Sequence, residues 1–303
     1  MKRLLSTYAS DLAAMSPAEF KQAIKASEGR TVLGETVVTA APLIDGVSNA
    51  EMMAAFSCDL LLLNELDVFA PEIVGFYECA NPIAELKYLT GRPIGINLEP
   101  VDTSQQLLEN RVELASGRQV SPQSLEQAQK LGVDFIVLTG TPATGVSLAA
   151  ISEAIALAKQ HFSGLVFAGK MHGAGLGEAV VDGPALLEFI QQGADGILVP
   201  AVGTVPGVRE ELLAPLVSQL KAQGALVIST IGTSQESADS QTIRDLALSN
   251  KRVGADIHHI GDGSYGCMPD PDNILALSLA VRGKRHTYFK MGQSVRRRVL
   301  LIF

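Results

Sequence analysis

The stretch Gly132–Gly140, GVDFIVLTG, contains the pattern that decides the fold. A glycine that suits the end of a helix precedes an aspartate, and a short β-prone apolar run follows. The aspartate and its β-prone run occur again as CDLLLL (58–63), ADGILV (194–199) and ADIHHI (255–260), and a glycine precedes the last two of these. Asp134, Asp195 and Asp256 are spaced 61 residues apart, which leaves room for two strand–helix units in each interval. Because each aspartate opens a strand, we interpret these aspartates as structural.

Four other β-prone runs lie between these phrases: TVVTAA (36–41), PIGINLE (93–99), LVFAGKM (165–171) and LVISTI (226–231). Helical patterns fill most of the gaps, as in 121–132, where Ser121 is a cap, Pro122 occupies the first turn and Gly132 ends the helix. Further helices are expected at 147–161, 184–192, 209–223, 240–251 and 271–282.

Eight strands that alternate with helices predict parallel pairing and a closed sheet with helices outside. We therefore predict a single α/β domain, a (β/α)8 TIM barrel over residues 1–294, with an N-terminal lead-in helix at 17–27 and a separate tail at 295–303. An open doubly wound sheet is the alternative, but no GxGxxG follows the first predicted strand.

Composition narrows the range of functions. The 303 residues are 47% hydrophobic and carry a net charge of −8, which argues against a general nucleic-acid binder and favours small-molecule chemistry. Cys58, Cys79 and Cys267 form no CxxC pair, so neither a disulfide framework nor a thiolate zinc site is expected.

The N-terminal apolar run is interrupted by Ser6, Ser10 and Asp11, which does not fit a secretion signal. No run reaches the roughly 18 to 20 apolar residues that span a bilayer. We expect a cytoplasmic protein without membrane or nucleic-acid partners, and a homo-oligomer would be ordinary for such a barrel.

In a TIM barrel the chemistry takes place where the strands end. Lys170 follows a buried strand, and there it can form a Schiff base, act as a general base or hold an anion. Glu65 and Glu99 are candidate general bases, and His172 is a candidate acid–base partner. The alternative for Lys170 is a structural ion pair with one of these glutamates.

A divalent metal such as Mg²⁺ or Mn²⁺ can be held by oxygen and imidazole ligands at the same strand ends. The candidates are Glu65, Glu99, His258 and Asp262. Adjacent residues of a strand point to opposite faces, so His258 and His259 cannot both line the barrel. His258 is preferred because it shares a face with Asp262.

Glycine–threonine pairs and a GDGSYG stretch follow several strands, and TIM barrels often bind phosphate with the loops after strands seven and eight. The predicted substrate- and phosphate-binding residues are Asn97, Thr139, Gly232, Thr233, Ser234, Gly261, Gly263 and Ser264. The long connection 100–120 is a candidate lid in which Arg111 and Arg118 can meet an acidic substrate. Their alternative is an ordinary solvated loop.

The phrases GRPIGINLEP, VDFIVLTGTPATGV, GKMHGAG and HHIGDGSYG resemble a bacterial family of uncharacterised TIM-barrel proteins that is loosely labelled phosphoenolpyruvate phosphonomutase-like. The segment of the fourth strand shows a fainter similarity to BtpA-like barrels. The resemblance implies a cytoplasmic barrel that acts on a small phosphorylated or carboxylated compound. Mutases and isocitrate lyases carry an acidic magnesium cluster and a Lys-Cys-Gly loop, where this chain has NLEPVD and GKMHG.

These observations together predict a lyase or isomerase that acts on a small phosphorylated carbohydrate, oxoacid or phosphonate. Two alternatives are a metal-dependent hydrolase and a barrel that binds a phosphorylated metabolite without converting it.

Overall fold

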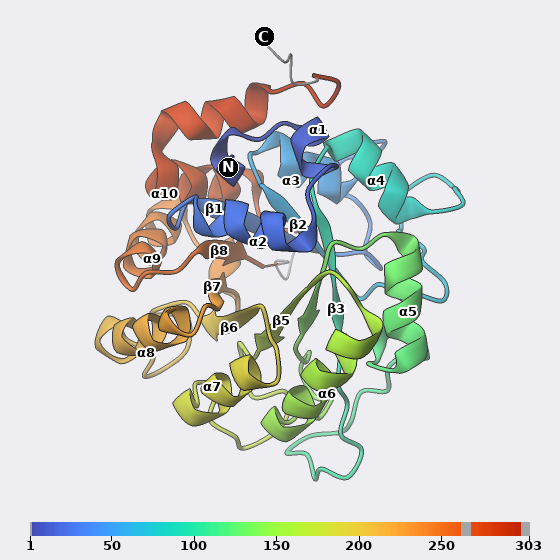
Figure 1. The fold of residues 1–303 in the computed structure, drawn as a ribbon, viewed down its shortest axis with the longest axis vertical. Helices are drawn as coiled ribbons and strands as arrows, with labels where there is room; N and C mark the ends of the chain where they lie inside the picture. The colour runs from blue at the N-terminus through green and yellow to red at the C-terminus, as the bar shows by residue number, and fades with distance from the viewer. Residues whose placement is uncertain (1, 262–267, 298–303) are drawn as a thin grey trace.

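The computed structural model describes residues 2–261 and 268–297 and contains a closed barrel of eight parallel strands in chain order (Figure 1). The predicted TIM barrel is confirmed. The strands are β1 (Thr31–Val37), β2 (Leu60–Asn64), β3 (Ile94–Leu98), β4 (Phe135–Leu138), β5 (Leu165–Gly169), β6 (Gly196–Pro200), β7 (Leu226–Ile231) and β8 (Ile257–Ile260).

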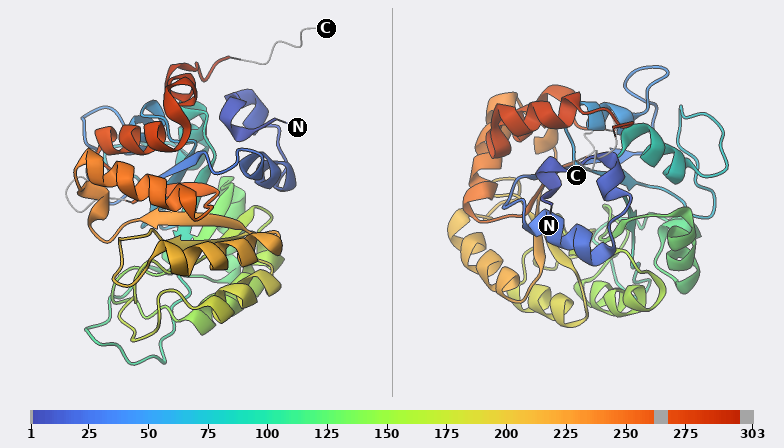
Figure 2. Two further views of the ribbon diagram at one scale, coloured as in Figure 1. Left: turned by 90° about the vertical axis from the view of Figure 1, so that its left-hand side faces the viewer. Right: turned by 45° about the horizontal axis from the view of Figure 1, so that its top comes forward.

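Helices surround the barrel on its outside, and the first two lie across one of its ends (Figures 1 and 2). The main ones are α1 (Ala9–Leu12), α2 (Pro17–Lys25), α3 (Asn49–Ala55), α4 (Pro82–Thr90), α5 (Pro122–Leu131), α6 (Leu148–His161), α7 (Gly183–Gln191), α8 (Glu210–Ala222), α9 (Ser240–Arg252) and α10 (Pro271–Gly292). Short 3-10 turns are η1 (Leu4–Ser6), η2 (Ser116–Arg118) and η3 (Gln235–Ser237). No helix of the described ranges is long and apolar enough to cross a membrane.

Two boundaries differ from the sequence prediction, and helices form where none was predicted. β1 begins at Thr31, five residues before the predicted start, because Gly34 and Glu35 interrupt the apolar run without ending the strand. α3 and α4 form in gaps for which no helix was predicted, and Asn81 caps α4. α10 continues ten residues beyond the predicted end, through a kink at Gly283, whose φ of 69° suits glycine.

The repeated aspartates fasten each even-numbered strand to the strand before it. The Asp134 carboxylate accepts a hydrogen bond from the Ile94 N–H at 2.8 Å, while the Asp134 N–H donates to the Ile94 carbonyl. Asp195 makes the same pair of bonds with Val166, and Asp256 makes them with Val227.

A lysine from the helix that precedes the odd-numbered strand of each pair completes the arrangement. The three ion pairs are Lys87–Asp134, Lys159–Asp195 and Lys221–Asp256. Asp59 makes the equivalent bonds with Val32 and takes Arg282 and Lys290 of α10 as its cations. The recurring phrase is therefore a structural clamp, as its position before the strands indicates.

The barrel interior changes from apolar to polar along its axis. Its core contains Leu33, Phe135 and Phe167, and the N-terminal residues Leu4 and Phe20 pack against the same cluster. The N-terminal helices therefore cover one end of the barrel, as Figure 2 shows where they lie over the centre of the helical ring. The other end, where the strands finish, is lined by polar side chains.

Candidate active site at the carboxyl ends of the strands

A buried glutamate and histidine meet inside this polar end of the barrel. The Nε2 atom of His259 on β8 lies 2.8 Å from Oε2 of Glu35 on β1, and both side chains are almost fully buried. Asn97 on β3 donates from Nδ2 to the other oxygen of Glu35 at 2.6 Å. Three strands thus fix the glutamate on both oxygens.

Two atoms of this network face no partner within the described residues. They are Nδ1 of His259 and Oδ1 of Asn97, and Thr139 at the end of β4 has a buried hydroxyl in the same condition. Buried polar atoms are normally hydrogen-bonded, so atoms of this kind at a barrel mouth are expected to meet a ligand or water. The carboxylate bond orients the imidazole and leaves its second nitrogen for proton transfer.

His258 does not belong to this site, and its selection as a metal ligand was wrong. The strand alternation places Ile257 in the barrel core and His259 two residues later on the same face, so His258 points outward. Its Nε2 atom contacts the Gly29 carbonyl at 3.0 Å, and burial lowers its pKa to about 4. His258 therefore packs outside the barrel as a neutral side chain.

Glu35 and His259 are the site residues that the sequence interpretation missed. Glu35 lay outside the predicted first strand, and the face of β8 was assigned by its relation to Asp262. A signal was available in the alternation Leu33–Glu35, which places the glutamate two residues beyond a core leucine.

Glu65 and Glu99 lie on the rim of the mouth and share one cation. The Arg118 guanidinium is 3.6 Å from Glu65 and 3.7 Å from Glu99. Glu99 accepts hydrogen bonds from the N–H and the hydroxyl of Thr141, both at 2.9 Å. Glu65 accepts one from Thr39 at 2.6 Å. Arg118 is therefore an ion-paired rim residue and not a solvated loop side chain.

Burial raises the pKa of Glu99 in spite of the hydrogen bonds from Thr141 and the nearby Arg118. Glu65 adopts a left-handed conformation with a φ of 66°. Left-handed non-glycine residues also follow β4, β5 and β7 at Ala143, Ala174 and Thr233. Such backbone conformations concentrate at functional sites, and here they mark the loops around the mouth.

Lys170 is held by neighbouring loops and is 1% exposed. Its ammonium donates to the carbonyl of Val146 at 2.8 Å, to that of Gly173 at 3.2 Å and to Glu178 at 3.1 Å. Burial lowers its pKa, and Glu178 opposes this effect. The structural alternative for Lys170 fits these contacts, although its carboxylate partner is Glu178 instead of Glu65 or Glu99.

His172 is half-buried and has a defined tautomer. Its Nδ1 atom accepts a hydrogen bond from the Ala174 N–H at 3.0 Å, so in the neutral ring the proton resides on Nε2. Burial and the charge of Lys170 lower the pKa of His172, while Glu35 acts in the opposite direction. His172 is therefore a neutral hydrogen-bond donor near Glu35 at neutral pH.

The loop after β7 and the end of β8 lie against each other, as the phosphate prediction requires. The Gly261 N–H donates to the Ile231 carbonyl at 2.8 Å, next to Gly232. Thr233 and Ser234 both have positive φ angles, and the Thr233 hydroxyl is bonded to the Thr204 carbonyl. Asp262, Gly263 and Ser264 lie outside the described residues.

The metal prediction finds no support in the described part of the chain. No group of three or more histidine, cysteine, aspartate or glutamate side chains there is arranged to hold a metal ion. Arg118 already lies between the two rim glutamates.

The connection after β3 docks on the loops after β4 and β5. Arg111 donates to the carbonyls of Thr144, Asp102 and Gln105, and the Val112 N–H donates to that of Ala143. The predicted lid therefore rests beside the mouth, and Arg111 is engaged in holding it there.

The fold and its polar mouth define the chain as a TIM barrel with a candidate active site at the carboxyl ends of its strands. The chain belongs to the family described as "Domain of unknown function (DUF7916)", whose model matches residues 5–297. No curated protein matches it in sequence.

Solved structures with the same fold include 2,3-dimethylmalate lyase, a PEP mutase/isocitrate lyase superfamily member. It is 11% identical, with a TM-score of 0.50 over 86% of this chain and 83% of that one. An archaeal fructose 1,6-bisphosphate aldolase is 13% identical, with a TM-score of 0.52 over 86% of this chain and 96% of that one. At these identities the similarity establishes the fold alone.

Proposed function

We propose that the protein is a lyase or isomerase that moves a proton on a small phosphorylated carbohydrate, oxoacid or phosphonate. The observation that carries the proposal is the buried Glu35–His259 pair, whose second imidazole nitrogen has no partner among the described residues. The names of the two similar structures, a lyase and an aldolase, agree with this class of reaction.

His259 acts as the base in this mechanism. Glu35 holds the Nε2–H of His259, so the lone pair of Nδ1 can take a proton from a carbon next to a carbonyl group. The imidazolium that forms is stabilised by the Glu35 carboxylate, which Asn97 keeps in place. An isomerase returns the proton to the neighbouring carbon, whereas a lyase uses the enolate electrons to expel a leaving group.

His172 polarises the carbonyl group. Its Nε2–H is a neutral donor, and it can hydrogen-bond to the oxygen on which negative charge develops. The loop at 232–234 supplies backbone N–H groups for a phosphate or carboxylate at the far end of the substrate. Glu65, Glu99 and Arg118 form the polar rim against which hydroxyl groups can bind.

The test is a substrate screen in D2O followed by proton NMR. Sugar phosphates, oxoacids and phosphonates are each incubated with the protein, with and without Mg²⁺ or Mn²⁺. We expect at least one compound to lose a carbon-bound proton signal or to form a product. A compound that raises the melting temperature but neither exchanges nor reacts would contradict the proposal and favour a barrel that only binds its ligand.

A further inference from the structure

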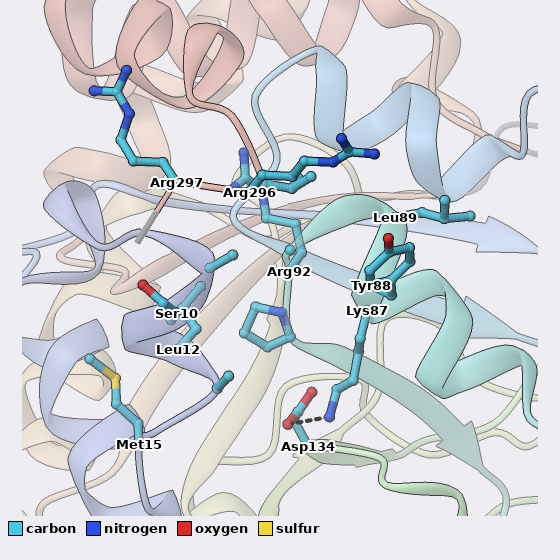
Figure 3. A pocket seen from close by; sticks show the side chains of 15 residues that line it. Ser10, Leu12, Met15, Lys87, Tyr88, Leu89, Arg92, Asp134, Arg296 and Arg297 are labelled. Carbon is cyan, nitrogen blue, oxygen red and sulfur yellow. Dashed lines mark hydrogen bonds and ion pairs between the residues drawn. The ribbon is translucent and has the colours of Figure 1, made fainter. Parts of the chain in front are cut away.

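A pocket opens at the end of the molecule opposite the candidate active site. It has a volume of 770 Å³ and lies between α1, the C-terminal end of α4, the start of β3 and the chain at 295–297 (Figure 3). This is the end that the N-terminal helices cover, whereas the long loop after β3 lies at the other end (Figure 2). The pocket is within the size range of small-molecule sites and is separate from the strand ends.

The charge of this pocket is opposite to that of the whole protein. Lys87, Arg92, Arg296 and Arg297 line it together with a single carboxylate, Asp134, which leaves an excess of three positive charges in a chain whose net charge is −8. A concentration of positive charge in a concave site attracts anions.

The cations of the pocket differ in whether they already have a partner within the protein. Lys87 is paired with Asp134 at 2.7 Å, as the dashed line in Figure 3 marks. Arg297 lies over the ring of Tyr8. Arg296 extends across the pocket toward Tyr88 and Leu89, and its guanidinium makes no ion pair with the described residues (Figure 3).

Arg92 adds a buried positive charge at the back of the pocket. One nitrogen of its guanidinium donates to the Lys290 carbonyl at 2.8 Å, but its Nε–H has no acceptor in the described chain. The negative charge of Asp59 raises the pKa of Arg92, but Asp59 already forms ion pairs with Arg282 and Lys290. The positive charge of Arg92 is therefore incompletely balanced by the protein.

Apart from Ser10, the rest of the lining is mostly apolar, and it includes one exposed aromatic ring. Leu12 and Met15 line one side, and Leu89 and Tyr88 line the other. Tyr88 is 68% exposed, which is high for a tyrosine beside a pocket. A flat ring of a ligand can pack against it, since aromatic rings favour stacked contacts.

We propose that this pocket binds a small phosphorylated compound with a flat aromatic ring, the chemistry of a nucleoside phosphate. The ring lies against Tyr88, and the phosphate groups meet Arg296 in the positive field of Arg92. The site is independent of the reaction at the strand ends and would make the N-terminal face a second ligand-binding face of the barrel.

The test measures binding of ADP, adenosine and pyrophosphate to the full chain by isothermal titration calorimetry. We expect one ADP site, with adenosine and pyrophosphate each binding at least tenfold more weakly, because each has only one of the two recognised parts. Arg296→Gln should weaken ADP binding about tenfold, since a charge-assisted hydrogen bond contributes on this scale. Tyr88→Ala should weaken ADP and adenosine binding but not pyrophosphate binding.

The matched control is Arg285→Gln, which removes one exposed arginine of α10 that does not line the pocket. It should leave the affinity for ADP within twofold of the wild type. The proposal is overturned if ADP shows no saturable binding, if Arg296→Gln binds ADP as well as the wild type, or if Arg285→Gln weakens binding as much as Arg296→Gln.

Discussion

Lys170 and His172 are two residues apart, and the positive charge of Lys170 helps to lower the pKa of His172. Lys170 donates to two loop carbonyls and to Glu178, so its nitrogen has no free direction in which to attack a substrate carbonyl. His172 presents a neutral donor instead. At this site the lysine holds the loops in place, and its charge adds to burial in lowering the pKa of His172.

Lys170→Met is expected to lower the free energy of unfolding by about 1 to 3 kcal/mol, because Val146, Gly173 and Glu178 lose a buried donor. It should also raise the pKa of His172, since a nearby positive charge is removed. In the wild type this pKa is lowered below its unfolded value, so the unfolded chain binds more protons as the pH falls. The contribution of His172 to stability is therefore present above the unfolded pKa and is lost as the pH falls through the folded pKa.

Chemical denaturation and a proton NMR titration of His172 measure the two effects, and Lys130→Met on the exposed face of α5 is the control. Borohydride treatment with a carbonyl substrate should leave no covalent adduct on the wild-type protein. A trapped adduct at Lys170, or a His172 pKa that stays the same in Lys170→Met, would refute the structural role.

At the scale of elements, the aspartate clamps join the strands to the helices in pairs. The carboxylates of Asp134, Asp195 and Asp256 each hold an N–H near the start of the preceding strand and a lysine from the helix before that strand, as Asp195 does with Val166 and Lys159. This arrangement explains why the phrase recurs at a fixed interval, because each copy closes one two-strand unit of the barrel.

Asp195→Ala is expected to destabilise the protein by about 1 to 3 kcal/mol, since a strand N–H loses its acceptor and Lys21 and Lys159 lose their counter-ion. Asp195→Asn should cost less, because an amide oxygen can still accept from Val166. Urea unfolding measures both changes against Asp245→Ala, which removes an exposed carboxylate of α9. Equal losses for Asp195→Ala and Asp245→Ala would show that the clamp contributes nothing.

Most of the barrel could be predicted from the sequence, because continuous apolar strands and capped helices are local patterns. The neighbouring sequence does not explain why Gly34 and Glu35 stand within the apolar run of the first strand. A side chain at Gly34 would collide with Met53 and Cys58, which pack against this position. Glu35 can be buried because His259 and Asn97, which are far away in the chain, hydrogen-bond to its carboxylate. For the same reason Arg118 was predicted to meet an acidic substrate, and its ion pairs with Glu65 and Glu99 were not predicted.

At the scale of the whole molecule, the barrel has two unlike ends. The strand ends carry Glu35, His259 and the rim carboxylates, whereas the covered end carries a positive pocket formed by α4 and the chain at 295–297. The kinked second half of α10 reaches this covered end, where Lys290 is buried beside Asp59 and burial lowers its pKa to about 7. The proposed chemistry and the proposed nucleotide site are thus separated by the apolar core.

The most direct test of the acid–base centre is the rate of solvent-deuterium exchange into the substrate that the screen identifies, compared between the wild type and Glu35→Gln. We expect Glu35→Gln to slow exchange by at least about 100-fold, since His259 loses the carboxylate that orients it and stabilises its protonated form. His161→Gln, on the outer helix α6, should stay within twofold of the wild type. An exchange rate in folded Glu35→Gln that equals the wild-type rate would contradict the assignment of the Glu35–His259 pair as the catalytic centre.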